Sequence, residues 1–179
     1  MTAHARAAAA VEELARLVAA VDPAELDALV AELRPGRRVY LSGFGRSGLV
    51  ARAFAMRLMH LGLDTAVVGE TATPAISAGD VLIVLSSSGS GAPARAQVGT
   101  ARAVGADVVA LSARRDVPLA ELGARVLVVP SRTEVATEQH AGSLFEQGCL
   151  VLADAVCSEL RERLGVTTAD MDARHANLQ

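Results

Sequence analysis

Apolar residues along this chain fall into short continuous runs and longer periodic segments. The run Val-Leu-Ile-Val-Leu at 81–85 is typical of a strand buried on both faces of a helix-covered parallel sheet. Comparable short segments predict four more strands, over residues 38–42, 65–68, 108–111 and 125–129. Apolar positions at helical spacing predict helices between and after them, over residues 47–61, 92–104 and 142–163.

The alternation of strand and helix predicts an α/β fold with right-handed crossovers. We expect a three-layer αβα sandwich around a five-stranded parallel sheet in the flavodoxin-like order 2-1-3-4-5. With 179 residues the chain has room for one substantial core and not for two large ones. The prediction is a single domain, in which residues 1–34 form a helical arm and residues 35–179 form the sandwich.

Two helices are predicted within residues 5–33. They are separated at Asp22-Pro23, where the aspartate can cap the second helix and the proline suits its first turn. The first helix has apolar residues at the spacing of a helix-packing seam, namely Val11, Leu14, Val18 and Val21. Two interpretations stay open: the seam packs on the chain's own core, or it joins one subunit to another.

The composition narrows the possible classes of function. Hydrophobic residues make up 51% of the chain and aromatic residues 2%, so the core must be built from Ala, Val, Leu and Ile. A net charge of −3 argues against a nucleic-acid partner, which requires a basic face. All 17 basic residues are arginine, which excludes a standard P-loop, a lysine Schiff base and a pyridoxal-phosphate enzyme.

Compartment and redox state are also predicted from the sequence. No apolar run is long enough to span a bilayer and the N-terminal segment lacks a cleavable apolar stretch, so we expect a soluble, cytoplasmic protein with no membrane partner.

Cys149 and Cys157 lie about 12 Å apart on one predicted helix, at a rise of ~1.5 Å per residue. They cannot pair with each other, and we expect both to be reduced core residues.

A loop rich in hydroxyls and glycines follows the 81–85 strand and precedes a predicted helix. Its sequence is Ser86-Ser87-Ser88-Gly89-Ser90-Gly91. Backbone N–H groups and the positive end of the helix dipole converge at such a junction, and serine hydroxyls suit phosphate oxygens. The loop therefore predicts a phosphate site, the alternative being an ordinary solvated turn.

A second loop of this kind, Gly43-Phe44-Gly45-Arg46-Ser47-Gly48, joins the first predicted strand to its helix. It matches the G-x-G-x-x-G pattern of dinucleotide-binding domains, and Asp64 or Glu70 lies near the spacing of a ribose-binding carboxylate. A nicotinamide enzyme is therefore one hypothesis, although the chain has no room for a second nucleotide-binding half. Because strands one and three are neighbours in the predicted sheet, we expect the two loops to face each other across the ligand crevice. Arg46 and Ser47 would there contact phosphate oxygens.

A third group of candidate residues, at 142–147, opens the last long helix. Ser143 and Glu146 have the S-x-x-E spacing of a capping box, and spacing alone favours helix capping as the role of this glutamate. The alternative is a carboxylate placed in an apolar turn to remove a proton next to a carbonyl.

Longer stretches of the sequence resemble the sugar isomerase (SIS) family. The resemblance runs from about residue 43 to the C-terminus and includes Gly-Arg-Ser-Gly-Leu-Val-Ala at 45–51, Ala-Met-Arg-Leu-Met-His-Leu-Gly at 55–62, Val-Gly-Glu-Thr at 68–71 and Thr-Pro-Ala-Ile at 73–76. Two further segments are similar to the members that isomerise hexulose phosphates, Gly-Ser-Leu-Phe-Glu-Gln at 142–147 and Arg-His-Ala-Asn-Leu at 174–178.

The resemblance implies an αβα sandwich that forms a homo-oligomer, usually a tetramer. It implies an enzyme that interconverts 3-hexulose 6-phosphate and fructose 6-phosphate without a metal or organic cofactor. By position, Ser47, Ser86 and Ser88 are the implied phosphate and sugar ligands, with Arg46 beside them. Glu146 is the implied catalytic base, and the resemblance thus favours this role over helix capping.

Two more residues belong to the expected site. His175 is the leading candidate for moving hydroxyl protons, because imidazole donates and accepts near neutral pH; the alternative is a frayed chain end. Family members commonly have Ser-Gly-Ser-Gly-Glu-Thr in the serine loop, whereas the last two places here are Ser90 and Gly91. Either Ser90 replaces the missing threonine hydroxyl or phosphate binds less tightly. The alternative functions are isomerisation of a pentose or heptose phosphate and non-catalytic sensing of a sugar phosphate.

Overall fold

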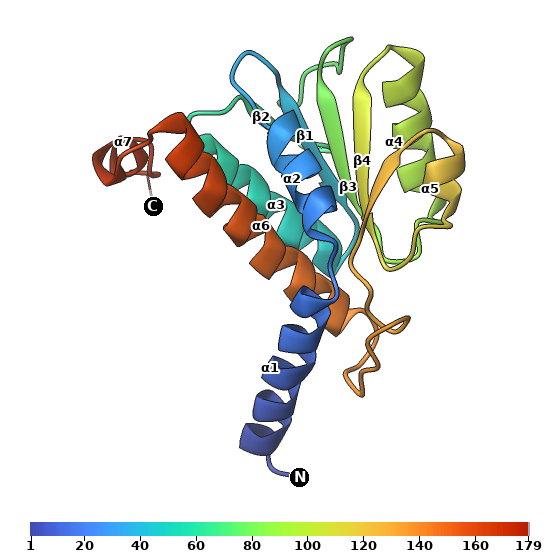
Figure 1. Cartoon of the computed structure of the whole chain (residues 1–179). Helices are drawn as coiled ribbons and strands as arrows, with labels where there is room; N and C mark the ends of the chain where they lie inside the picture. Colours follow the sequence, from blue (N-terminus) through green and yellow to red (C-terminus); the bar gives the residue numbers. More distant parts are fainter. Residues whose placement is uncertain (179) are drawn as a thin grey trace.

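The segments predicted as strands form one parallel sheet in the computed structural model, which describes residues 1–178 (Figure 1). The strands are β1 (Val39–Gly43), β2 (Thr65–Val67), β3 (Val81–Leu85), β4 (Asp107–Ser112) and β5 (Arg125–Val128). Each adjacent pair is parallel, and the order is β2-β1-β3-β4-β5. The predicted α/β fold and strand order are confirmed.

Helices precede, connect and follow the strands. They are α1 (Ala3–Ala19), α2 (Pro23–Glu32), α3 (Arg46–His60), α4 (Ala92–Ala103), α5 (Pro118–Glu121), α6 (Ser143–Leu164) and α7 (Thr168–Ala173). As predicted, Asp22 caps α2, its carboxylate accepting the Ala24 N–H at 2.9 Å. The short helices α5 and α7, of 4 and 6 residues, were not predicted, because so few residues show no periodicity.

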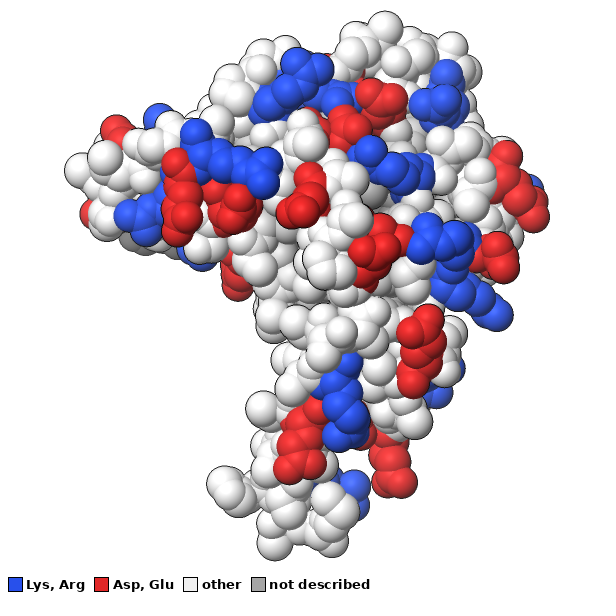
Figure 2. Space-filling model, viewed as in Figure 1, with Lys and Arg blue, Asp and Glu red and all other residues white. Residues whose placement is uncertain are grey.

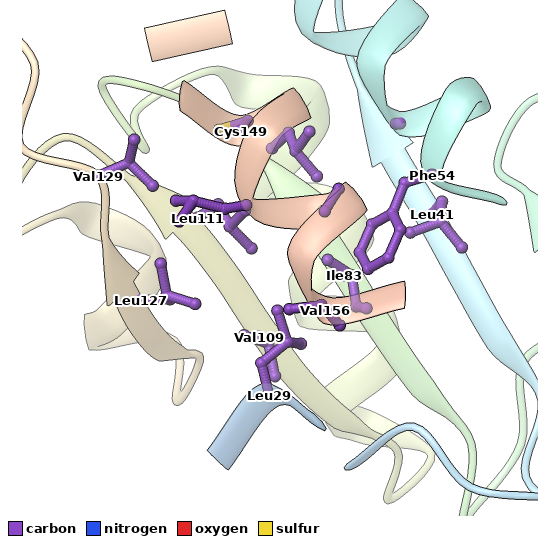
Figure 3. Close-up of a cluster of buried hydrophobic side chains, with 14 of the residues drawn as sticks. Leu29, Leu41, Phe54, Ile83, Val109, Leu111, Leu127, Val129, Cys149 and Val156 are labelled. Atoms are coloured by element: carbon purple, nitrogen blue, oxygen red, sulfur yellow. The ribbon is translucent and has the colours of Figure 1, made fainter. Parts of the chain in front are cut away.

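The alternating sides of each strand build two apolar layers. Ile83 of β3 packs with α2, α3 and α6, whereas its neighbours Leu82 and Val84 pack with α4 and α5. Figure 3 shows α6 lying over the first face, with Phe54 of α3 and Val156 of α6 against the strands. All five residues of β3 are at most 2% exposed, which explains their unbroken apolar sequence.

The N-terminal helices have different environments. Helix α2 packs against α6 and β5 in the helical layer, whereas α1 packs on α6 and then extends away from the sheet towards its N-terminus (Figure 1). Residues 1–34, predicted as one arm, therefore divide into a projecting helix and a helix of the sandwich. Of the predicted seam, Val21 just beyond α1 is 5% exposed and Leu14 packs partly buried against the core, whereas Val11 and Val18 are 66% and 37% exposed. The predicted seam thus splits between the core and an outward face.

A buried arginine ties the amino-terminal edge of the sheet together. Arg37 is 6% exposed and forms ion pairs with Glu32 of α2 and Asp107 of β4. It also donates to the Asp80 carbonyl just before β3 at 3.1 Å. Because Arg37 lies two residues before β1, one side chain thereby links a helix to the starts of three strands.

Tyr40 of β1 is the largest side chain on the α4 face of the sheet. It is 1% exposed, and its hydroxyl donates to the Ala75 carbonyl at 2.9 Å. On the outer surface, acidic and basic side chains are interspersed over the face shown in Figure 2. Within residues 1–178, no helix has the length and apolar character needed to cross a membrane.

Candidate functional site

The loop after β1 is a close contact between strand and helix. A Cβ on Gly43 would lie 2.7 Å from the Ser47 carbonyl oxygen, and a Cβ on Gly48 would lie 2.7 Å from the Gly43 carbonyl oxygen. Only glycine fits at both places, because each contact is with backbone. The glycine pattern is therefore explained by a tight turn, and this turn brings Ser47 to the carboxyl end of the sheet.

The serine loop, Ser86–Gly91, follows β3 at the same edge of the sheet. The Ser112 hydroxyl at the end of β4 donates to the Ser86 carbonyl at 2.8 Å and fixes the start of the loop. Ser88 and Ser90 are exposed, and their hydroxyl oxygens are 2.8 Å apart in a mutual hydrogen bond. Helix α4 begins directly afterwards and has no side-chain cap, so the N–H groups of its first turn, to which Pro93 contributes none, lack a side-chain partner.

The two loops face each other across a cleft of about 350 Å³, as the sheet order predicted. The cleft is lined by Phe44, Ser47, Leu85, Ser86, Ser87, Ser88, Arg132, Ala141 and Gly142. Ser47, Ser86 and Ser88 therefore share one cavity, and Ser90 lies beside it, bonded to Ser88. The third wall, formed by the segment between β5 and α6, was not predicted.

Glu146 lies in the first turn of α6 at the rim of this cleft. Its carboxylate is ion-paired with the Nε of Arg46 from the opposite loop, and the two side chains are 13% and 64% exposed respectively. Its Oε1 lies 3.4 Å from the place that a Cβ on Gly142 would occupy, and Gly142 lines the cleft. The glutamate thus faces the predicted phosphate loops and is largely shielded from solvent.

The capping box that the spacing of Ser143 and Glu146 favoured does not form, so helix capping is not the role of this glutamate. Helix α6 begins at Ser143 itself, its N-cap is Gly142, and no side chain caps it. The Ser143 hydroxyl instead donates to the His140 carbonyl at 2.8 Å. The glutamate is drawn away from the helix backbone because the Arg46 guanidinium offers it a charged partner.

His175 lies away from the cleft in its own chain. Its ring stacks on His60 at the end of α3, with centroids 5.2 Å apart and an interplanar angle of 16°. Arg174 holds this end of the chain by donating to the His60 carbonyl at 3.1 Å. Burial, reinforced by His175 and Arg57, lowers the pKa of His60. The structure therefore does not bring His175 to Glu146 within one chain.

The cysteines are core residues, as predicted. Cys149 and Cys157 are 0% and 4% exposed on the inner face of α6. Burial raises the pKa of both thiols, to about 12 for Cys157, so neither is poised as a nucleophile. In the described part of the chain, no three His, Cys, Asp or Glu side chains come together as candidate metal ligands.

The sequence patterns missed two residues that shape the cleft. Arg132 lines it from the loop before α6, and Glu13 of α1 accepts hydrogen bonds from Thr137 and Gln139 of the same loop. The loop has no apolar periodicity, so nothing local marks it. Glu13 was missed for another reason: from the sequence alone, a glutamate on a helix cannot be told apart from a solvent-exposed charged residue.

Comparisons with known proteins give a consistent result. A family model described as SIS domain matches residues 32–147. The 3-hexulose-6-phosphate isomerase of Mycobacterium gastri is 41% identical over 173 residues, which cover 94% of this chain and 87% of that protein. That of Methylomonas aminofaciens is 39% identical over 146 residues, covering 79% of this chain and 81% of the relative. A crystal structure from Methanococcus jannaschii, described as inferring a 3-hexulose-6-phosphate isomerase function, has a TM-score of 0.84 and 28% identity, covering 95% of this chain and 97% of that one.

Proposed function

This chain belongs to the SIS domain family, and on that premise we propose that it interconverts 3-hexulose 6-phosphate and fructose 6-phosphate. Relatives named for this isomerisation align with most of its length. The observation that carries the proposal is the place of Glu146, a shielded carboxylate at the rim of a cleft lined by serine hydroxyls. The serine hydroxyls of the cleft can bind a phosphorylated ligand, and the carboxylate can transfer protons to and from that ligand.

The phosphate end of the substrate is assigned to the serines of the cleft. Ser47, Ser86, Ser88 and Ser90 lie where two parallel strands end and the helices that follow them begin. Hydroxyls there can bond phosphate oxygens, and N–H groups at the starts of α3 and α4 add the favourable end of each helix dipole. Ser90, which is bonded to Ser88, is assigned the place of the threonine hydroxyl.

The carbonyl end of the substrate is assigned to Glu146. Moving a carbonyl from C3 to C2 removes the C2 proton, passes through a 2,3-enediolate and returns a proton to C3, and one carboxylate can perform both transfers. Negative charge develops on the enediolate oxygens. Arg46 holds the carboxylate and presents its guanidinium to that charge, which fixed donors stabilise without reorganisation.

We assign His175 to the site of a neighbouring copy. Helix α6 has 22 residues, so its two ends are about 33 Å apart at ~1.5 Å per residue, with Glu146 near one end and α7 after the other. The exposed Val11 and Val18 of α1 supply an apolar face for subunit contact. We assign the chain to a cytoplasmic homotetramer with a sugar phosphate as its small-molecule partner.

Deuterium exchange tests the reaction. Purified protein is incubated with fructose 6-phosphate in deuterated water. We expect deuterium at C3 of the recovered fructose 6-phosphate, together with the appearance of 3-hexulose 6-phosphate. Glu146→Gln should lose exchange by at least a hundredfold while fructose 6-phosphate still binds. Glu162→Gln, an exposed acid at the other end of the same helix, should exchange normally. Full exchange in Glu146→Gln would remove this residue from the role of base.

Mixed oligomers test the assignment of His175. Chains carrying Glu146→Gln and chains carrying His175→Ala are each expected to lack activity. Oligomers assembled from both should regain part of it, because some sites then combine an intact carboxylate with an intact imidazole. Mixed oligomers that form and stay inactive would contradict a histidine supplied by a neighbour.

A further inference from the structure

The segment between β5 and α6 forms one wall of the cleft. Arg132 and Ala141 of this segment line the cleft together with the serine loop. They are also the two non-glycine residues with positive φ among those the structure describes, at 60° and 49°. Residues other than glycine rarely adopt a left-handed backbone conformation. This conformation persists only where the surrounding structure enforces it, and it is frequent at ligand-binding sites.

Hydrogen bonds hold Arg132 in this conformation. Its N–H donates to the Val135 carbonyl at 2.8 Å, and the Val135 N–H donates to the Pro130 carbonyl at 3.0 Å. Its Nη2 donates to the Gln139 carbonyl at 2.6 Å. The residue is exposed and forms no ion pair with any residue that the structure describes, so the guanidinium keeps donors for an incoming ligand.

A phosphorylated ligand would bring its negative charge into a cleft that Arg132 lines. Among the described residues that line the cleft, it is the only charged one. Arg46, the nearby cation on the opposite loop, is already paired with Glu146. A phosphate monoester carries a charge of about −1.5 to −2, and serine hydroxyls do not balance that charge. A guanidinium does, through two parallel N–H···O bonds.

Helix α1 holds the same segment through a buried carboxylate. Glu13 is 8% exposed and accepts the Thr137 hydroxyl at 2.6 Å, the Gln139 side-chain amide at 2.9 Å and the Glu138 N–H at 3.3 Å. The backbone carbonyl of that same Gln139 accepts the Arg132 guanidinium. Glu13 and Arg132 are therefore joined through a single residue.

We propose that Arg132 binds the phosphate group of the substrate and that Glu13 is a positioning residue that holds Arg132 at the cleft. The phosphate then lies between the serine hydroxyls on one side and the guanidinium on the other. This inference rests on the proposed function in that a phosphorylated ligand occupies the cleft, and it adds the residue that neutralises the charge of that ligand.

Substitutions at Arg132 test the binding role. Arg132→Asn keeps a residue that tolerates a left-handed backbone, so its melting temperature should match that of the unchanged protein. Its KM for fructose 6-phosphate should rise about tenfold to hundredfold with kcat changed less than threefold, and inorganic phosphate should bind correspondingly more weakly. Arg132→Lys, which keeps the charge, should lose less. Arg34→Asn removes an exposed arginine at the opposite edge of the sheet and should leave KM unchanged.

A double-mutant cycle tests the positioning role. Glu13→Ala should raise KM at least fivefold, Glu13→Gln should raise it less, and Glu12→Ala, the exposed neighbour, should leave it unchanged. Adding Glu13→Ala to Arg132→Asn should not raise KM further, because the glutamate acts through the arginine. A purely structural glutamate would lower the melting temperature without this dependence on Arg132. If Glu13→Ala raises KM by the same factor in the presence and in the absence of Arg132→Asn, the positioning role is overturned.

The inference and the proposed reaction fail in different ways. If the unchanged protein isomerises fructose 6-phosphate and Arg132→Asn has normal KM and phosphate affinity, the inference is overturned and the reaction stands. If the unchanged protein shows no turnover but binds fructose 6-phosphate, and Arg132→Asn binds it more weakly, the reaction fails and the inference stands. Absence of both turnover and binding overturns both.

Discussion

Adding one methyl group at Gly48 should destabilise the protein, whereas the same change at Gly99 should stabilise it. Both glycines lie in helices, where Gly→Ala ordinarily gains up to about 1 kcal/mol. A Cβ at Gly99 would have no neighbour within 4 Å, but at Gly48 it would lie 2.7 Å from the Gly43 carbonyl oxygen. Overpacking costs about 1–3 kcal/mol, and a rigid backbone contact falls toward the upper end of that range. We expect Gly48→Ala to lose about 1–2 kcal/mol net.

Thermal unfolding measures the difference directly. At about 2–4 °C per kcal/mol for a chain of this size, the two variants should separate in melting temperature by roughly 2–12 °C. Gly48→Ala should also weaken binding of fructose 6-phosphate, because the carbonyl it displaces belongs to the turn that carries Ser47. Equal melting temperatures would refute the claim that close approach of strand and helix determines this loop.

Three further outcomes are expected. Burial and nearby cations lower the pKa of His60, so its contribution to stability is present above about pH 6.5 and is lost as the pH falls. The melting temperature should therefore drop between pH 7 and pH 5, and it should drop less in His60→Asn. Arg37→Met should cost about 1–2 kcal/mol in urea unfolding, because it removes the buried hydrogen bond to the Asp80 carbonyl and two ion pairs, while Glu32 keeps Arg125 as a partner. The exposed ion pair of Arg38 should contribute less than about 1 kcal/mol. Cys149 and Cys157 should resist a thiol reagent in the native protein and react fully in guanidinium, and rapid native labelling would contradict their burial.

The parts of the fold that the sequence predicted depend on local signals. The apolar run of β3 and the helical spacing of α3, α4 and α6 are properties of short segments, and topology rules then give the strand order. The two glycine and serine loops could be found for the same reason. Their meeting across one cleft followed from the order of β1 and β3 in the sheet.

The parts that were missed depend on contacts between distant segments. Whether Glu146 caps its helix or pairs with Arg46 is decided by a residue 100 positions away. The backbone of Arg132 is left-handed because Gln139 and Val135 hold it, which no local propensity shows. Such contacts form only once the sheet has assembled, so spacing along the chain does not reveal them.

Tyr40 gives this protein a single natural optical probe. The chain contains one tyrosine and no tryptophan, so near-ultraviolet absorbance and emission arise almost entirely from one phenol, which is buried and donates to the Ala75 carbonyl. Near-ultraviolet absorbance is therefore weak, and the absorbance of the peptide bonds measures concentration more sensitively. In return, any change in that emission during unfolding reports on one known place, the packing between β1 and α4, without an introduced label.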